Sequence, residues 1–285
     1  MSEIITQLLN GLVVGMTLAL LASGLSIIFG MLNVVNFAHG AFYMLGAYAA
    51  LVVIKAGGGF WLSLIVGTTA VFMIGLVVEV LGVRPLYGKG EILPLLLTFG
   101  LSLVFTESIL AIFGPLGSVI KKPTVFSGAV NLGFIVYPKY RLFIILFTLG
   151  ITGLLWLFIA KSRLGLLIRA GIQDTIMARA IGVRVRPLFT LVFGIGAALA
   201  AVAGIISSAI QGVEPYMGMK ILIPAFVVVT VGGLGSFRGA IIAGVLIGEA
   251  KALSILIWPP MSDVVMYVLM ALILLVKPEG LFQSM

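Results

Sequence analysis

Apolar segments, most of them long enough to cross a bilayer, follow one another along almost the whole sequence. About 20 helical residues span the roughly 30 Å hydrocarbon layer of a membrane. Hydrophobic residues make up 62 % of the chain and charged residues 9 %, so the chain cannot cover itself with a water-facing surface. The sequence therefore predicts an all-α, polytopic helical membrane protein that forms a single transmembrane domain over residues 1–285. We expect eight or nine membrane segments, at residues 9–30, 38–54, 61–81, 92–113, 140–160, 188–210, 222–235, 238–257 and 263–276.

The seventh and ninth of these segments are too short to cross the bilayer as ordinary helices. Fourteen residues at about 1.5 Å each reach only about 21 Å. Half-helices or re-entrant segments are expected here, and irregular backbone at membrane depth is tolerated only where protein or a water-filled cavity covers it. The glycines at the end of the seventh segment predict a backbone break that serves as a gate for a solute pathway: Gly232, Gly233 and Gly235.

One loop, residues 161–187 (KSRLGLLIRAGIQDTIMARAIGVRVRP), holds six of the seventeen basic residues. Positive residues in short loops mark the cytoplasmic side of a membrane protein. Alternation of the segments then places four more basic residues on the same side: Arg84, Lys89, Arg238 and Lys277. Because the positive charge of +8 lies in short loops between membrane segments, nucleic acid is not an expected partner.

The basic loop contains the signals of a short capped helix. Asp174 can cap Thr175–Ile181, and Gly182 can end that helix with Arg179 in its last turn. Asp174, Ala178 and Gly182 lie four residues apart, which predicts a face of small residues that another surface can approach closely. We interpret the loop as a cytoplasmic docking surface; the alternative is a solvated loop that only sets topology or contacts anionic membrane lipid.

The sequence offers little for enzyme chemistry. It has no cysteine and a single histidine, His39, so no catalytic residue, metal site or cofactor is expected in this chain. The phrase closest to a nucleotide-binding P-loop, GVRPLYGKG at residues 82–90, has the wrong glycine spacing and ends in glycine where a serine or threonine should bind magnesium.

Polar side chains inside apolar segments are the candidates for a solute pathway, because each costs several kcal/mol in lipid unless it faces protein or water. Asn33, Asn36 and His39 lie where the first segment gives way to the second. Glu107 lies within the fourth segment, and Glu249 and Lys251 lie within the eighth. A hydrogen-bonded helix break without solute contact explains the first three equally well. An interhelical contact, or a position near the interface, is the alternative for Glu107.

Four stretches resemble permeases of the branched-chain amino-acid ABC transporter family, the LivH/LivM type, and most closely the LivH-like subunit. The pattern from Arg169 to Val183 is similar to the family's coupling segment. The other three are NVVNFAHGAFYMLGAY (33–48), EVLGVRPLYGKG (79–90) and VEPYMGMKILIPAFVVVTVGGLGSFRGAIIAGVLIG (213–248), and they occur in the family's order. Val80 departs from it, because an arginine is expected there in many members.

The resemblance implies an integral permease subunit of a bacterial inner-membrane importer, not an enzyme. Its implied partners are two cytoplasmic ATP-binding subunits, which hold ATP and Mg, a second related permease in a heterodimer or homodimer, and a soluble solute-binding protein. The implied solutes are branched-chain or other hydrophobic amino acids, or urea, amides and aromatic acids. We expect Arg163 and Arg169 to contact the ATPases together with the residues of the capped helix, Asp174, Ala178, Arg179 and Gly182. The alternative function is a self-sufficient secondary transporter or channel for a small solute.

Overall fold

The computed structural model describes residues 2–131, 133 and 135–282, and most of these residues are helical. Among them, eight helical stretches are long and apolar enough to cross a membrane, and one further apolar helix is shorter. This confirms the predicted all-α, polytopic membrane fold. The helices of the bundle are α1 Ser2–Leu32, α2 Ala38–Lys55, α3 Phe60–Val78, α4 Ile92–Phe113, α5 Lys139–Lys161, α8 Val185–Gln211, α9 Met217–Gly232, α10 Phe237–Ile257 and α11 Ser262–Val276.

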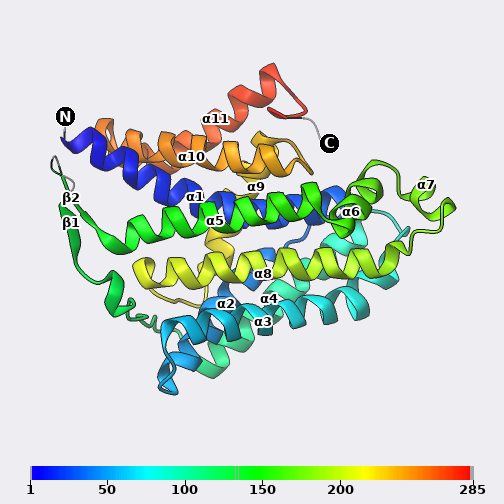
Figure 1. Ribbon diagram of the computed structural model, residues 1–285, viewed down its shortest axis with the longest axis horizontal. Coiled ribbons are helices and arrows are strands. Elements are labelled where there is room, and N and C mark those ends of the chain that lie inside the picture. The colour runs from blue at the N-terminus through cyan, green and yellow to red at the C-terminus, as the bar shows by residue number, and fades with distance from the viewer. Residues whose placement is uncertain (1, 132, 134, 283–285) are drawn as a thin grey trace.

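Shorter elements lie at the two ends of the bundle. α6 Arg163–Gln173 and α7 Thr175–Ala180 project from the end opposite the N-terminus (Figure 1). At the N-terminal end, a small antiparallel hairpin that the sequence did not suggest joins β1 Ala129–Asn131 to β2 Val136–Pro138. The remaining turns are the π-helical turn η1 Glu79–Val83 and the 3₁₀ turns η2 Arg84–Leu86, η3 Thr124–Phe126 and η4 Pro259–Met261.

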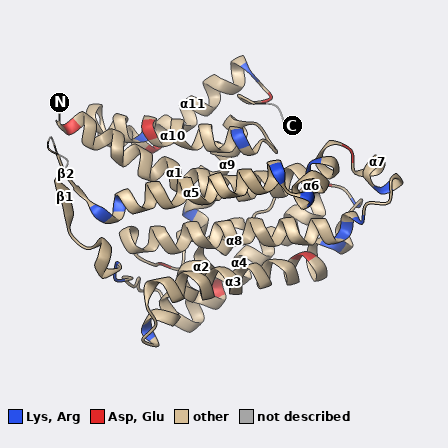
Figure 2. Cartoon of the chain, in the orientation of Figure 1, with Lys and Arg blue, Asp and Glu red and all other residues tan. Residues whose placement is uncertain are grey.

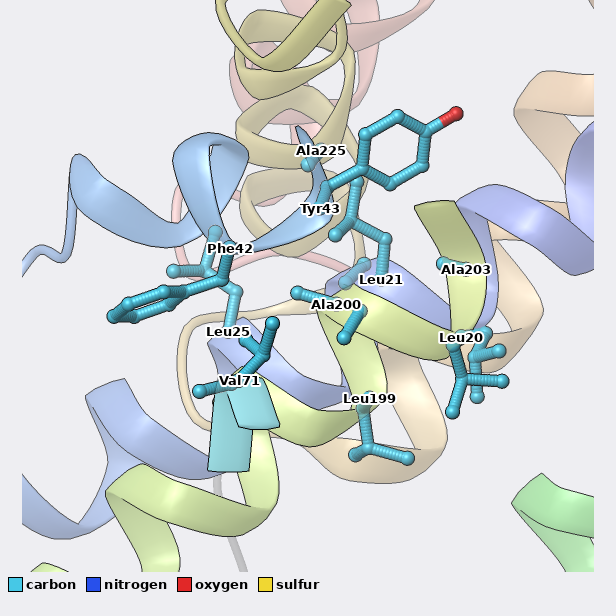
Figure 3. Packing of buried hydrophobic residues seen from close by; sticks show 14 of the residues in the cluster. Leu20, Leu21, Leu25, Phe42, Tyr43, Val71, Leu199, Ala200, Ala203 and Ala225 are labelled. Atoms are coloured by element: carbon cyan, nitrogen blue, oxygen red, sulfur yellow. The ribbon is translucent and has the colours of Figure 1, made fainter. Parts of the chain in front are cut away.

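Three helices form the centre of the bundle. In the most apolar stretch of α1, 83 % of the residues are buried inside the protein, whereas the corresponding figure for η4 and α11 together is 6 %. α2 and α8 are similarly enclosed. Leu21 and Leu25 of α1, Phe42 of α2, and Ala200 and Ala203 of α8 belong to one buried cluster (Figure 3). The outer helices expose one apolar side each, as expected of helices that contact lipid or another membrane protein.

Three predicted segments differ clearly from their expected bounds. The first, expected at residues 9–30, is the longer helix Ser2–Leu32. The seventh begins at Met217 instead of residue 222 and ends at Gly232, so Gly235 lies in the turn after the helix. The ninth is not a half-helix, because η4 extends α11 to 18 residues and gives it the length of a membrane span. The short helix predicted from the sequence is therefore α9 alone.

Loops that carry basic residues meet at the end of the bundle formed by α6 and α7. Arg84 donates a hydrogen bond to Thr190 near the start of α8. A Cβ atom added at Gly30, near the end of α1, would lie 3.1 Å from the Cα of Gly235. One added at Gly280, which follows Lys277, would lie 2.6 Å from the Cα of Gly233. Basic side chains are concentrated at this end (Figure 2), which identifies it as the cytoplasmic side under the positive-inside rule.

Glycines bring the backbones of α1 and α10 into direct contact. A Cβ atom added at Gly248 would lie 2.4 Å from the Cα of Gly15, and one added at Gly15 would lie 2.9 Å from the carbonyl oxygen of Gly244. Lipid supplies no hydrophobic drive for helices to associate, so such close van der Waals packing is a main source of stability in membrane bundles.

We predict that Gly248→Ala destabilises the protein by about 1–3 kcal/mol, because the added methyl group must push α1 and α10 apart. Gly150→Ala in α5 is the matched control, since a Cβ atom there meets nothing within 4 Å. Thermal unfolding of both variants in detergent checks the prediction. Equal unfolding temperatures for the two variants would contradict it.

Candidate solute cavity and coupling segment

The basic loop folds into two capped helices at the cytoplasmic end. The hydroxyl of Ser162 accepts a hydrogen bond from the backbone N–H of Gly165 at 2.8 Å and caps α6. Asp174 Oδ1 accepts from the N–H groups of Ile176 and Met177 at 2.8 and 2.9 Å and caps α7. Gly182 follows with a φ of 88°, a left-handed conformation that favours glycine. The predicted helix and both of its end signals are confirmed.

The exposed face of α7 is apolar and is not the face of small residues that we expected. Ala178 is only 3 % exposed, because its side chain packs into the core of the same chain. Ile176, Met177 and Ile181 are instead 82 %, 59 % and 71 % exposed. We call these three residues the apolar coupling face. Asp174 and Gly182 shape the helix that presents it.

The basic residues of the segment divide into two groups. Arg163 is exposed at the start of α6, and Arg179 is exposed in α7, the helix that presents the apolar coupling face. Arg169 turns back, and its Nη1 donates to the carbonyl oxygen of Ala160 at 3.0 Å, near the end of α5. A cation that binds the last carbonyl groups of a helix stabilises that helix end. Arg169 therefore positions α6 against α5, and the contact to an ATPase that we expected of it remains a prediction.

A cavity of about 530 Å³ lies beneath the coupling segment. It is bounded by Gly171 and Arg179 on one side and by the end of α1 and the loop before α4 on the other. A Cβ atom added at Gly171 would lie 3.1 Å from the methyl group of Met31, so α6 touches α1 directly. We call this the inner cavity.

The structure separates the polar residues near the start of α2. Asn36 and His39 are fully buried: Asn36 Oδ1 accepts from the N–H of Ala38 at 3.0 Å, and His39 Nε2 lies 2.9 Å from the carbonyl oxygen of Leu21. Asn33 lines the inner cavity and donates to Glu91 at 2.9 Å. These contacts describe a hydrogen-bonded helix break, the alternative that the sequence left open, and place the three residues away from the outer cavity described below.

Glu107 and Glu249 also lie apart from both cavities. Glu107 is exposed on the outer side of α4, with no hydrogen bond or ion pair to any residue that the structure describes. Glu249 faces α1, where a Cβ atom added at Gly11 would lie 2.5 Å from its Oε2. Neither position supports solute contact within this chain, so the structure gives no support to these two assignments.

The predicted backbone break follows α9. Gly233 and Gly235 have φ values of 100° and 81°, which only glycine adopts readily. The C-terminal residues cover this break: the N–H groups of Leu281 and Phe282 donate to the carbonyl oxygens of Val231 and Gly232 at 2.8 and 3.1 Å. The last carbonyl groups of α9 are thereby satisfied. The role of Gly232, Gly233 and Gly235 as a gate remains a prediction.

A larger cavity of about 760 Å³ lies in the half of the bundle near the N-terminus. Six helices line it, α1, α5, α8, α9, α10 and α11, together with Tyr43 of α2. The first half of α9, from Met217 to Pro224, forms part of its wall. The cavity reaches inward as far as Leu18 and Ser207. We call it the outer cavity.

The charged residues of the outer cavity are Arg141, Glu214, Lys220, Lys251 and Asp263, and only Lys251 was among the candidates chosen from the sequence. They come from four separate parts of the chain, so only tertiary packing brings them together. One further signal was present: Asn10 is a polar residue near the start of the first apolar segment, and it also lines the cavity. The other five candidates for the solute pathway lie elsewhere.

A second missed site is a buried ion pair after α3. Glu79 is fully buried, and its Oε2 lies 2.8 Å from Nη2 of Arg84. Tyr87 donates to Glu79 Oε1 at 2.8 Å, and burial together with this hydrogen bond raises the pKa of the Tyr87 hydroxyl. These contacts hold the loop before α4 against the first turns of α8.

Comparison with known proteins identifies the kind of bundle. The family described as branched-chain amino acid transport system / permease component matches residues 7–274. The chain belongs to this family. It is 34 % identical to the high-affinity branched-chain amino acid transport system permease protein BraD of Pseudomonas aeruginosa and 32 % identical to the corresponding LivH of Escherichia coli K12. Each alignment covers 96 % of this chain and 94 % of the relative.

The second kind of permease in the same family is a more distant relative. The high-affinity branched-chain amino acid transport system permease protein LivM of Escherichia coli K12 is 28 % identical over 92 % of this chain and 67 % of its own length. The chain is therefore LivH-like, as its motifs indicated, and a multi-pass membrane permease. No solved structure matches it significantly.

We predict that Arg84→Ala lowers the stability of this permease by about 3 kcal/mol, because the buried carboxylate of Glu79 then loses its cation. Lys89→Ala, an exposed change in the same loop, should leave the unfolding temperature in detergent unchanged. The double variant Glu79→Gln with Arg84→Gln should be more stable than Arg84→Ala, since it leaves no buried charge unpaired. A double variant no more stable than Arg84→Ala would refute this account.

Proposed function

We propose that this chain is the LivH-like permease subunit of an ATP-driven importer in the bacterial inner membrane, and that it moves branched-chain or other hydrophobic amino acids. The observation that carries the proposal is the match to the permease family over residues 7–274, with relatives aligned over 94 % of their length. The outer cavity adds to it, because charged groups and apolar walls together suit an amino acid.

Energy for transport comes from partner chains in this proposal. The sequence contains no P-loop, so ATP and its magnesium bind to two cytoplasmic ATPase subunits. The apolar coupling face is the surface that those subunits bind, together with Arg179 of α7 and the exposed Arg163 at the start of α6. An exposed apolar patch on a capped helix next to basic residues is typical of a protein interface.

A series of contacts connects the coupling segment to the outer cavity. Gly171 of α6 touches Met31, near the end of α1, and the neighbouring Gly30 touches Gly235 in the break after α9. The other end of α9 lines the outer cavity. Movement of α6 and α7 by the ATPases would therefore reach α9 through two packed contacts, and a shift of α9 would reshape the cavity.

The permease works with further partners. A second permease binds to the apolar sides of the outer helices, and the similarity to LivM favours a related but different chain over a second copy. A soluble solute-binding protein delivers the solute to the outer end of the bundle. Lipid contacts the apolar helix sides that remain uncovered.

A gradient-driven transporter or channel is the rival function, and no specific contact favours it. Of its candidate coupling groups, Glu107 and Glu249 lie apart from both cavities, and Lys251 lines the outer cavity but is paired with Asp263. Purified chain in liposomes tests it directly: proton- or sodium-driven uptake by this chain alone would replace the importer proposal.

Affinity purification from the native membrane in mild detergent, followed by mass spectrometry, tests the importer proposal. We expect two P-loop ATPases and a sister permease to be retained. Recovery of the chain alone, or only with itself, would overturn the proposal.

We predict that Ile176→Glu removes the ATPases from the purified complex, because a carboxylate replaces the most exposed side chain of the apolar coupling face. Val119→Glu is the matched control, since Val119 is 81 % exposed in the loop at the opposite end of the bundle. The ratio of ATPase to permease in the purified material is the measurement. Unchanged ATPase recovery with Ile176→Glu would exclude this face as the docking surface.

A further inference from the structure

The outer cavity holds three cationic side chains, and two of them already have an acidic partner. Lys220 Nζ lies 2.7 Å from Glu214 Oε1, and Lys251 Nζ lies 2.6 Å from Asp263 Oδ1. Arg141 has no carboxylate partner among the residues that the structure describes. A cation without an acid, in a cavity at the outer end of a membrane bundle, is available to an anionic ligand.

Neighbouring side chains hold Arg141 in place without neutralising it. Its Nη1 donates to Asn10 Oδ1, and the hydroxyl of Tyr137 donates to the same oxygen at 3.0 Å. Asn10 is fixed in turn, because its Nδ2 donates to Gln7 Oε1 at 3.1 Å. The other N–H groups of the guanidinium remain available, and their planar fork matches the two oxygens of a carboxylate.

The cavity changes from polar to apolar with depth. Along α1, Gln7 and Asn10 line it near the outer end, and Val13, Val14 and Leu18 line it further in. Asn10 and Leu18 are eight residues apart, so about 12 Å of helix separates the polar level from the innermost leucine. Ile144 follows Arg141 by three residues on α5 and adds to the apolar wall.

We propose that Arg141 binds the α-carboxylate of an aliphatic amino acid in the outer cavity, with the side chain of that solute directed toward Leu18. The solute class rests on the proposed function, whereas the role of Arg141 rests on the geometry above. A lipid phosphate offers the same anionic oxygens at this depth, and the experiment below distinguishes the two sources.

The test measures binding of L-leucine to the complete permease–ATPase complex in nanodiscs of zwitterionic lipid, without the solute-binding protein and without ATP. Saturation-transfer NMR reports the bound leucine, and L-leucinamide, which keeps the ammonium and isobutyl groups but lacks the carboxylate, is the competitor. We expect leucine to bind and leucinamide at equal concentration not to displace it. Arg141→Gln should weaken leucine binding about tenfold or more, and Arg141→Lys less, because lysine keeps the charge but loses the fork.

Lys139→Gln is the matched control, because it removes a cation two residues away that does not line the cavity. Unchanged leucine binding in Arg141→Gln would overturn the proposal, and so would equal competition by leucinamide. Repeating the measurement in nanodiscs that contain anionic lipid tests the lipid source: loss of leucine binding there would show that Arg141 binds a lipid phosphate and would overturn the proposal as well. If Arg141→Gln does not assemble, the leucinamide comparison on the unaltered complex still decides. If leucine binding does not depend on Arg141 but the complex still takes up leucine with ATP, the proposed function stands and only the role of Arg141 is refuted. A purified complex that contains no ATPases would refute the proposed function itself.

Discussion

Direct backbone contact at glycines is the interaction on which the rest of this structure depends. Gly15 and Gly248 join α1 to α10, Gly24 and Gly196 join α1 to α8, and a Cβ atom at Gly204 would lie 2.0 Å from the carbonyl oxygen of Tyr43 in α2. Since lipid is as apolar as the side chains, helices gain little from hiding them, and close van der Waals contact must hold the bundle. A centre packed backbone to backbone cannot deform gradually.

α9 belongs to this contact network. A Cβ atom added at Gly218 would lie 2.5 Å from the carbonyl oxygen of Gly40 in α2, and one added at Gly232 would lie 2.5 Å from the carbonyl oxygen of Gly239 in α10. Any shift of α9 must therefore break close backbone contacts at both of its ends.

α9 nevertheless has the features of a helix that bends. It has 16 residues, contains Pro224, and is followed by Gly233 and Gly235 in left-handed conformations. A proline inside a helix removes one backbone hydrogen bond and favours a bend. The N–H groups of the C-terminal segment satisfy the last carbonyl groups of α9, so this segment is tied to the end of the helix.

The sequence predicted the features that depend on neighbouring residues and missed those that depend on packing. Apolar length located the spans, and Asp174 and Gly182 defined α7, because caps are local chemistry. The direction of Ala178 was wrong, since which side of a six-residue helix faces the core depends on what lies beneath it. Arg141 and Asn10 are 131 residues apart, and nothing in either local sequence indicates that they meet. Asn36 and His39 are polar groups within apolar surroundings, and backbone hydrogen bonding accounts for one polar atom of each, Asn36 Oδ1 and His39 Nε2. Asn36 Nδ2 and His39 Nδ1 are buried without a hydrogen-bond partner among the described residues.

The two cavities lie on opposite sides of a closed layer, and this arrangement limits how a solute can cross. Along α1, the outer cavity ends at Leu18 and the inner cavity begins at Gly30, so about 18 Å of helix separates them. Fully buried side chains such as Leu21, Leu25 and Ile28 fill that interval. α9 borders the outer cavity at its first residues, and the break that follows it touches Gly30 of the inner cavity. A shift of α9 away from α1 would therefore open the layer and change both cavities together, whereas a shift of α6 alone would change only the inner one. In the proposed importer, coupling to ATP would therefore pass through the contact between Met31 and Gly171, because it is where α6 meets the helix that borders both cavities.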